Sequence, residues 1–167
     1  MGGRVSPKSA LTSLDVSKNT ALNHLDCGDN QLLSLDVSKN TGLTYLDCYA
    51  NKLSLLDVSK NTALRTLYCG NDQLTILDVS KNTALDDLGF SNTQLTSLDV
   101  SNNTAMRRLL ITSNQFTDIQ LNALFRTLHG NTISGGKTVY ILGNPGTDSC
   151  DKNIATSKGW TVNTTAY

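Results

Sequence analysis

The chain has 167 residues and carries 14 basic and 14 acidic side chains, so its formal net charge is zero. This balance argues against a nucleic-acid binder or a polybasic membrane partner, because both need clustered positive charge. The hydrophobic content of 38% is low for a globular domain, no apolar run reaches the length of a membrane span, and the first residues hold no apolar segment of a secretory signal.

Residues 1–10 precede the first recognisable motif, and we interpret them as leader residues or as the end of a preceding segment of a longer protein. Leu11 holds the same place in the repeated pattern of the chain as Leu32, so the pattern begins in the middle of a coil. Repeat proteins normally cover such an edge with a polar capping element. We therefore expect this N-terminal edge to fray or to support self-association.

A heptapeptide, LDVSKNT, recurs with a fixed 21-residue period. Its copies start at Leu14, Leu35, Leu56, Leu77 and, as LDVSNNT, at Leu98. Between them lies a second unit, L-x-x-L-x-C-x-x-N-x-L, whose five successive copies begin with the one at Leu22. A period of this length is typical of stacked coils, and the second unit is the leucine-rich-repeat signature. We predict that residues 11–119 form a right-handed α/β leucine-rich-repeat solenoid with a half coil and five repeats.

Each repeat predicts one short strand. The second leucine of the unit and the cysteine position alternate with outward-facing residues, which is strand periodicity. The first strand is expected at residues 24–28, with an equivalent in each later repeat, and such strands form a parallel sheet on the concave face. The 21-residue coil is near the short end for this repeat class, so we expect a helix-poor convex side.

The cysteine position predicts a buried ladder. Successive coils place Cys27, Cys48, Cys69, Phe90 and Ile111 there. Interchange with large apolar residues indicates an inward-facing position, where a free cysteine behaves as a small hydrophobic residue. Parallel side chains on neighbouring strands do not suit disulfide geometry, and no CxxC motif or partner histidine suggests a metal site. We predict reduced, buried thiols with no metal.

Polar residues also recur in columns. The asparagine of the second unit, Asn30 in the first coil, should satisfy backbone groups where the chain turns away from the sheet. Asp72 and Thr93 replace it in coils three and four, so slight irregularity is expected there. On the convex side, aspartate and lysine columns repeat with LDVSKNT, and we favour a solvated, mutually neutralised stripe over an anion-binding ladder. An ice-binding array of Asn-Thr pairs is a more distant alternative.

The period stops after Ile119, and we expect residues 120–167 to form a small C-terminal α/β cap of the same domain. Hydrophobic spacing and turn residues predict that helices and extended segments alternate in this cap. In chain order they are a helix at residues 121–128, a strand at 137–142, a second helix at 148–158 and an extended segment at 160–162. His129 follows the first helix, where a partly cationic side chain suits the helix dipole. The apolar residues of the cap should cover the last coil.

The repeated sequence LDVSKNTALxxLDCxxNQL resembles the 21-residue repeats of bacterial cell-surface proteins, in particular the internalin-like group with one cysteine per repeat. The resemblance covers residues 11–119, and the ending IATSKGWTV resembles the closing segment of secreted repeat proteins. It implies an extracellular or surface-displayed bacterial protein that binds host proteins or glycans. Coils four and five depart from the pattern because they lack the cysteine.

Function in such a solenoid is expected at outward strand positions, because inward positions are committed to packing. Exposed tyrosines with polar neighbours gather on the first three coils, a composition typical of binding hot spots. The candidate ligand-binding residues are Tyr45, Tyr49, Tyr68, Asp47, His24 and Asp26. Further along the same face, opposite charges such as Asp87 and Arg108 lie on neighbouring coils, and we interpret them as mainly structural.

These observations predict a non-enzymatic recognition module that binds a protein ligand on the concave sheet. No nucleophile and base lie in one plausible place, so no catalytic residue and no cofactor are expected. A weak cation site at His24, Asp26 and Asp47 is an alternative, although Cys27 faces inward and cannot join it. Two further alternatives are a structural spacer of a longer repeat protein, with its ligand site elsewhere, and a glycan-binding surface built from the same tyrosines.

Overall fold

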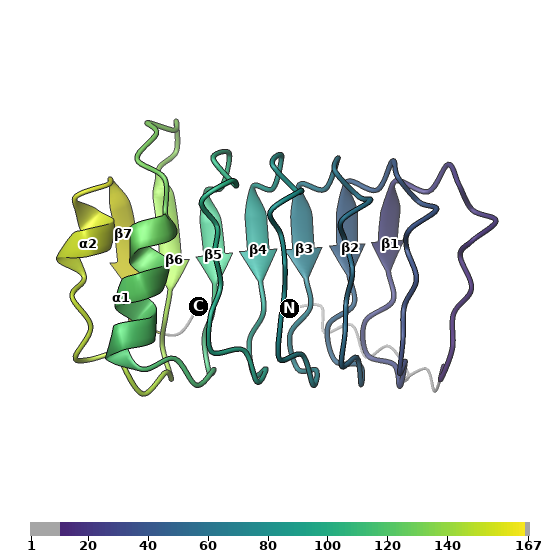
Figure 1. The fold of residues 1–167 in the computed structure, drawn as a ribbon, viewed down its shortest axis with the longest axis horizontal. Helices are drawn as coiled ribbons and strands as arrows, with labels where there is room; N and C mark the ends of the chain where they lie inside the picture. The colour runs from purple at the N-terminus through teal and green to yellow at the C-terminus, as the bar shows by residue number, and fades with distance from the viewer. Residues whose placement is uncertain (1–10, 166–167) are drawn as a thin grey trace, which may run out of the picture.

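The computed structural model describes residues 11–165, so the leader predicted over residues 1–10 lies outside the described residues. Seven short parallel strands form one sheet, in which they follow their order in the chain. They are β1 (His24–Asp26), β2 (Tyr45–Asp47), β3 (Thr66–Tyr68), β4 (Asp87–Gly89), β5 (Arg108–Leu110), β6 (Lys137–Tyr140) and β7 (Trp160–Asn163). Figure 1 shows the strands in a row along the long axis of the molecule, with both helices at the C-terminal end.

The register of the first five strands reproduces the 21-residue period. Leu46 of β2 pairs with Leu25 on one side and with Leu67 on the other. The central leucines of β2 to β5 are fully buried, whereas the first residue of each of these strands remains partly exposed. Parallel strands joined in this order require crossover connections, which are right-handed in nearly all proteins. The predicted leucine-rich-repeat solenoid is confirmed, although each strand spans three residues rather than five.

The cysteine position forms a buried column, as predicted. Cys27 is 6% exposed, Cys48 and Cys69 are fully buried, and all three thiols are free. Burial raises the pKa of all three thiols, that of Cys27 to about 12, so they stay protonated at neutral pH. Phe90 and Ile111 continue the column at full burial.

A first column of asparagines follows the strands. The side-chain oxygen of Asn51 accepts a hydrogen bond from the Leu32 amide at 3.0 Å. Its amide group donates to the carbonyls of Cys27 and Cys48, at 3.0 and 2.9 Å. One side chain therefore satisfies backbone groups of two successive coils, which confirms the predicted role of this position.

The residue before this column adopts a left-handed backbone in every coil, with φ between 54° and 57°. These residues are Asp29, Ala50, Asn71, Asn92 and Ser113. The turns at Asp72 and Thr93 share this backbone. The turn of coil four is slightly irregular, because the Asn92 amide lies 3.4 and 3.1 Å from the carbonyls of Thr112 and Ser113, respectively, whereas the equivalent amides of the other coils donate to one carbonyl. The side chains of Asp72 and Thr93 also differ from asparagine in the hydrogen bonds that they make.

A second asparagine column lies within LDVSKNT on the convex side. The Asn61 amide group donates to the carbonyls of Val37 and Asn40, at 3.0 and 2.9 Å. Equivalent pairs of bonds are made by Asn40, Asn82 and Asn103. All four side chains are fully buried, so the Asn-Thr repeat presents no asparagine array to solvent.

The aspartates of LDVSKNT bind backbone rather than lysine. Asp36 accepts a hydrogen bond from the Ser38 amide at 2.8 Å, and the same contact recurs in every repeat. Hydrogen bonds from the serines lower the pKa of Asp15, Asp36, Asp57 and Asp78. Within residues 11–165 no direct ion pair joins them to the lysine column. The stripe is solvated as predicted, but it is not built from contacting pairs.

The cap extends the sheet as well as covering the last repeat. β6 pairs with β5 and β7 pairs with β6, both in parallel. α1 (Asp118–Thr127) and α2 (Asn153–Thr156) lie beside these strands in Figure 1. α1 occurs where predicted and starts with a capping box at Thr117, whereas α2 is much shorter than predicted. Neither helix is long and apolar enough to cross a membrane in the part of the chain that the structure describes.

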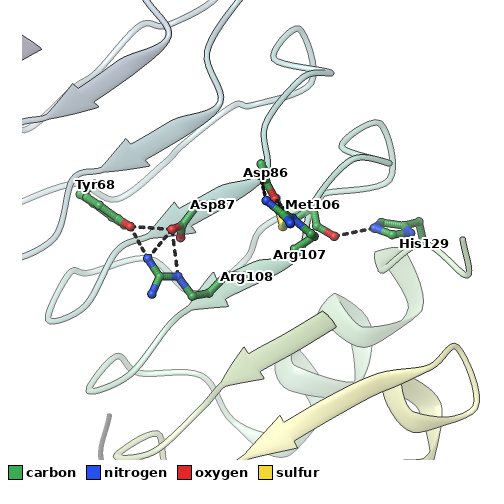
Figure 2. Close-up of polar contacts among 7 residues, drawn as sticks. All are labelled: Tyr68, Asp86, Asp87, Met106, Arg107, Arg108 and His129. Carbon is green, nitrogen blue, oxygen red and sulfur yellow. Dashed lines mark hydrogen bonds and ion pairs between the residues drawn. The ribbon is translucent and has the colours of Figure 1, made fainter. Parts of the chain in front are cut away.

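His129 connects the cap to the fifth repeat. Its Nε2 lies 2.8 Å from the Met106 carbonyl (Figure 2). Its Nδ1 accepts a hydrogen bond from the Asn131 amide at 3.2 Å. Both ring nitrogens are engaged by backbone groups, so the buried side chain links the cap to the fifth repeat and does not act on the helix terminus as predicted. His129 lies beyond the last residue of α1 and bonds to a different element.

Candidate ligand-binding face

Three aromatic rings cross the first three strands on the outward side of the sheet, which we call the sheet face. The His24 imidazole stacks on the Tyr45 ring, with centroids 4.1 Å apart and planes 11° apart. Tyr45 also meets Tyr68 in a T-shaped contact, with centroids 6.2 Å apart. His24 and Tyr45 hold equivalent positions in β1 and β2, whereas Tyr68 lies opposite Asp47 and reaches Tyr45 diagonally.

Two carboxylates lie side by side next to these rings. The register pairs Asp26 with Asp47, and a Cβ built on Gly28 would lie 3.7 and 3.5 Å from their respective Oδ1 atoms. Each Oδ1 accepts one amide of its own coil, from Gly28 at 3.3 Å and from Tyr49 at 2.9 Å. Burial raises the pKa of Asp47, and the charges of Asp26 and Asp29 raise it further. Neither carboxylate of the pair makes an ion pair within residues 11–165.

The C-terminal half of the sheet face neutralises its own charges, as Figure 2 shows. The Tyr68 hydroxyl donates to Asp87 at 2.6 Å and accepts from Arg108 at 2.5 Å. Arg108 also donates to Asp87 through Nε, at 2.9 Å. Alongside, Arg107 makes two hydrogen bonds to Asp86, at 2.6 and 2.5 Å. The structural interpretation of these charges is supported by direct ion pairs.

Two glycines allow tyrosine rings to lie against the next coil. A Cβ on Gly89 would come within 2.8 Å of the Tyr68 ring, and one on Gly70 within 3.0 Å of the Tyr49 ring. Both distances are shorter than ordinary contacts, so a larger residue would displace either ring. Tyr49 keeps 41% of its surface exposed, while Tyr68 is only partly exposed.

The structure thus divides the six predicted residues. His24 and Tyr45 stack beside the Asp26–Asp47 pair, and Tyr49 lies at the turn that follows β2. Tyr68 contacts Tyr45 but is also bound to Asp87 and Arg108, a connection that sequence reasoning missed. The available signal was spacing, because Tyr68, Asp87 and Arg108 come from three successive coils within two positions of the repeat.

The sheet face also has a shallow depression of about 320 Å³ over its paired half. Asp86, Asp87, Arg107 and Arg108 line it together with residues of β6 and the loop before it. No group of three histidine, cysteine or acidic side chains among residues 11–165 is arranged to hold a metal ion. The sheet face therefore offers aromatic and carboxylate groups at one end and a neutralised ion-pair network at the other.

Comparison with solved structures identifies the fold. The functional domain of InlJ from Listeria monocytogenes, which includes a cysteine ladder, is 33% identical over 92% of this chain, with a TM-score of 0.54. Internalin C2 of the same species is 19% identical over 95% of the chain (TM-score 0.76), and a leucine-rich-repeat protein of Leptospira interrogans is 21% identical over 92% (TM-score 0.75). The chain spans 41%, 68% and 40% of these three proteins, respectively. No protein-family profile and no curated protein matches it.

Proposed function

Because this chain is a leucine-rich-repeat solenoid of 21-residue repeats whose structural neighbours are internalin-like proteins, one of them with a cysteine ladder, we propose that it is a non-enzymatic recognition module for a protein ligand. The fold supports this proposal, because inward residues are committed to packing while outward strand residues form a continuous surface. Binding is assigned to the first three coils of the sheet face, around Tyr45, Tyr49 and Asp47, with His24 and Asp26 at the margin.

The observation that carries the assignment is the asymmetry of the sheet face. In coils four and five, Asp86 and Asp87 are each bound by an arginine of the next coil. In coils one and two, Asp26 and Asp47 lie on adjacent strands without a counter-charge in the described residues. Like charges directly opposite each other destabilise a sheet, so a ligand that supplies a cation removes this penalty.

The ligand chemistry that fits is a polypeptide segment with a lysine or arginine. Its charge would lie between the two carboxylates, and the adjacent Tyr45 ring would add a cation–π contact worth about 0.5–1 kcal/mol at an exposed site. Tyr68 borders this surface, and its orientation is fixed by the hydrogen bonds of its hydroxyl to Asp87 and Arg108. Tyr49 extends the surface toward the turn, with its ring lying on Gly70.

The glycan alternative uses the same tyrosines but finds fewer open ring faces. A sugar would stack on an aromatic face, and His24 already covers one face of Tyr45. The Tyr68 ring lies against Gly89. The spacer alternative does not account for two carboxylates, Asp26 and Asp47, that lie on adjacent strands without a counter-charge in the described residues. The protein-ligand proposal explains both features.

We further infer that the protein acts outside the bacterial cell, because its repeats resemble those of surface-displayed and secreted proteins. Antibody labelling of intact cells of the source bacterium, with permeabilised cells as control, tests this location. Labelling only after permeabilisation would overturn it.

The binding proposal is tested by selecting a phage-displayed random peptide library on the immobilised protein. Counter-selection uses a Tyr45→Ala/Asp47→Asn double variant whose folding has been checked by circular dichroism. Enriched peptides should carry lysine or arginine and should bind the wild-type protein at least about tenfold more tightly than the double variant, because truncation of a hot-spot aromatic typically costs about 2 kcal/mol.

A Lys39→Ala/Lys60→Ala variant of the convex side is the matched control and should bind these peptides as the wild type does. If the Lys39→Ala/Lys60→Ala substitutions reduce binding and the Tyr45→Ala/Asp47→Asn substitutions do not, the binding face lies on the convex side of the solenoid. Failure to enrich any peptide above background would contradict the recognition proposal and favour the spacer.

A further inference from the structure

One buried carboxylate in the first asparagine column lacks a partner for half of its polar surface. Asp72 is 8% exposed, and its Oδ1 accepts a hydrogen bond from the Leu53 amide at 2.8 Å, as the asparagines of other coils do. Its Oδ2 is buried and has no hydrogen-bond partner among the described residues. In an asparagine the corresponding atom is the amide nitrogen, which is a donor.

The repeat register identifies the groups that this oxygen faces. Asn51 donates from the equivalent position to the carbonyl of Cys48, three residues earlier, and to that of Cys27 in the preceding coil. For Asp72 the equivalent carbonyls belong to Cys69 and Cys48. Asp72 therefore places an acceptor where the column requires a donor.

The Cys69 carbonyl is short of a donor for a second reason. In the next coil Thr93 replaces the asparagine that would reach back to it, and its hydroxyl bonds to the Asn114 side chain instead, at 2.8 Å. The Cys48 carbonyl already accepts from Asn51, whereas no hydrogen bond to the Cys69 carbonyl occurs among residues 11–165. By the repeat register, the Asp72 Oδ2 and the Cys69 carbonyl are two acceptors that face each other without a donor, and each unsatisfied buried group is costly.

We propose that Asp72 is a built-in proton site: on acidification it takes up a proton, and the resulting hydroxyl donates to the Cys69 carbonyl and completes the column in coil three. A single proton satisfies both acceptors and removes a buried negative charge. Protonation of Asp72 thus raises the stability of the repeat in mild acid, whereas protonation of most carboxylates lowers the stability of a folded protein. This proposal is independent of ligand binding.

The groups around Asp72 do not supply a counter-charge. The titratable side chains packed nearest in the core are the thiols of Cys48 and Cys69, whose pKa values the Asp72 charge helps to raise. Lys52, in the turn of the preceding coil, donates to Gln31 at 3.1 Å. The turn of the following coil contributes the neutral Thr93.

Burial raises the pKa of Asp72 to about 6, against the lowering effect of the Leu53 and Asn51 amides. The unfolded value is about 3.9, so the folded state binds the proton more tightly. The stabilisation is fully present below about pH 4 and is lost as pH rises to about 6. A difference of about two pKa units corresponds to about a hundredfold change in the folding equilibrium.

The sequence offers a matched variant. Coil one reads Gly28-Asp29-Asn30 and coil three reads Gly70-Asn71-Asp72, so the same two residue types are exchanged. The exchange Asn71→Asp/Asp72→Asn rebuilds the coil-one order without changing composition or net charge. Both positions of the turn already accept these residues in coil one, including the left-handed backbone at Asp29. Folding of the variant is therefore expected.

The experiment measures urea unfolding of the wild type and of the exchange variant at pH 5 and at pH 7.5, where Asp47 and the other carboxylates contribute equally to both proteins. The variant should be more stable at pH 7.5, and on going to pH 5, about midway between the two pKa values, the folding equilibrium of the wild type should gain about tenfold on that of the variant. The Asp72 carboxyl carbon should titrate near pH 6 by NMR. Equal pH dependence of the two proteins, or titration of Asp72 near pH 4, would overturn the proposal.

Discussion

At the scale of single residues, the role of a tyrosine on the sheet face is set by what the next coil places beside it. Tyr68 faces Gly89, which leaves room for its ring, and Asp87 and Arg108, which bind its hydroxyl. Tyr45, at the first position of its strand rather than the third, stacks on His24 instead. Burial and the Asp87 carboxylate raise the pKa of Tyr68, so its hydroxyl stays protonated and continues to donate. Tyr68 is therefore partly a structural residue, which its exposed repeat position does not reveal.

We expect Tyr68→Phe to lower the free energy of unfolding by about 1–2 kcal/mol, because it removes a hydrogen bond to a carboxylate while keeping the ring on Gly89. Urea denaturation measures the change. Tyr49→Phe is the control, since Tyr49 is exposed and its hydroxyl makes no hydrogen bond within residues 11–165. Equal effects of the two substitutions would mean that the Tyr68 hydroxyl contributes nothing to stability.

The residues that could be predicted are those whose identity varies between coils in a way that reveals their environment. Cys48 is exchanged for Phe90 two coils later, so its burial followed from the sequence. The diagonal contact of Tyr68 and the bond of His129 to the Met106 carbonyl could not be predicted, because each depends on a residue from another element. Sequence columns align equivalent positions, but side chains also reach across them.

At the scale of the element, each coil is held by side-chain amides as much as by its three-residue strand. Asn144 shows that this rule extends into the cap, since it donates to the carbonyls of Ile111 and Ile141, each at 2.8 Å. The segment Ile141-x-Gly143-Asn144 repeats the spacing of Cys27-x-Asp29-Asn30, and Gly143 supplies the positive φ. The sheet-forming role of β6 was therefore readable from the sequence, although the cap was expected only to cover the last coil.

The length of α2 could not be read in the same way. Helical spacing suggested residues 148–158, but the amide of Asp151 bonds to the Asn122 side chain of α1 at 2.8 Å, outside any helical pattern. Gly146 passes so close to α1 that a Cβ there would lie 2.2 Å from the Asp118 amide nitrogen. Tertiary contacts with α1 thus hold this segment in turns and leave only a short helix.

Removal of one asparagine from the convex column should destabilise two coils at once, because its side chain also bonds to the preceding coil. Asn61→Ala removes two buried side-chain hydrogen bonds, leaves the carbonyls of Val37 and Asn40 with their backbone donors alone, and opens a small cavity, so we expect a loss of about 2–3 kcal/mol in the free energy of unfolding.

Asn19→Ala is the matched control for this substitution, because Asn19 holds the same repeat position but is exposed, and its side chain makes no hydrogen bond to any of residues 11–165. Thermal and urea unfolding of the two variants should differ clearly. Similar losses would show that the asparagine acts through the local turn and not through the preceding coil.

At the scale of the whole molecule, stability is passed between neighbouring coils, because each coil contacts only the coils beside it. The middle strands have neighbours on both sides and fully buried central leucines, whereas Leu25 of β1 remains partly exposed. At the other end, Lys158 donates to the last carbonyls of α1 and so fastens the cap. The two ends of the stack are therefore unequal.

Hydrogen exchange of the whole chain should follow this inequality. Amides of β1 should exchange at least about tenfold faster than those of β3 and β4, since opening the first coil disrupts one interface and opening a middle coil disrupts two. Mass spectrometry of peptic fragments resolves the difference. Uniform protection from residue 11 onward in a monomer would mean that residues 1–10 cover this edge after all.

The asparagine columns have a consequence for how such a protein changes over generations. Each asparagine bonds to the coil one repeat earlier, so loss or duplication of one whole repeat leaves equivalent donors and acceptors facing each other. Recombination between near-identical gene segments can therefore alter the number of coils while keeping the hydrogen bonds that join each asparagine to the coil before it. The distance between the aromatic end and the ion-paired end of the sheet face then becomes a heritable length, adjustable in steps of one strand spacing, about 4.8 Å.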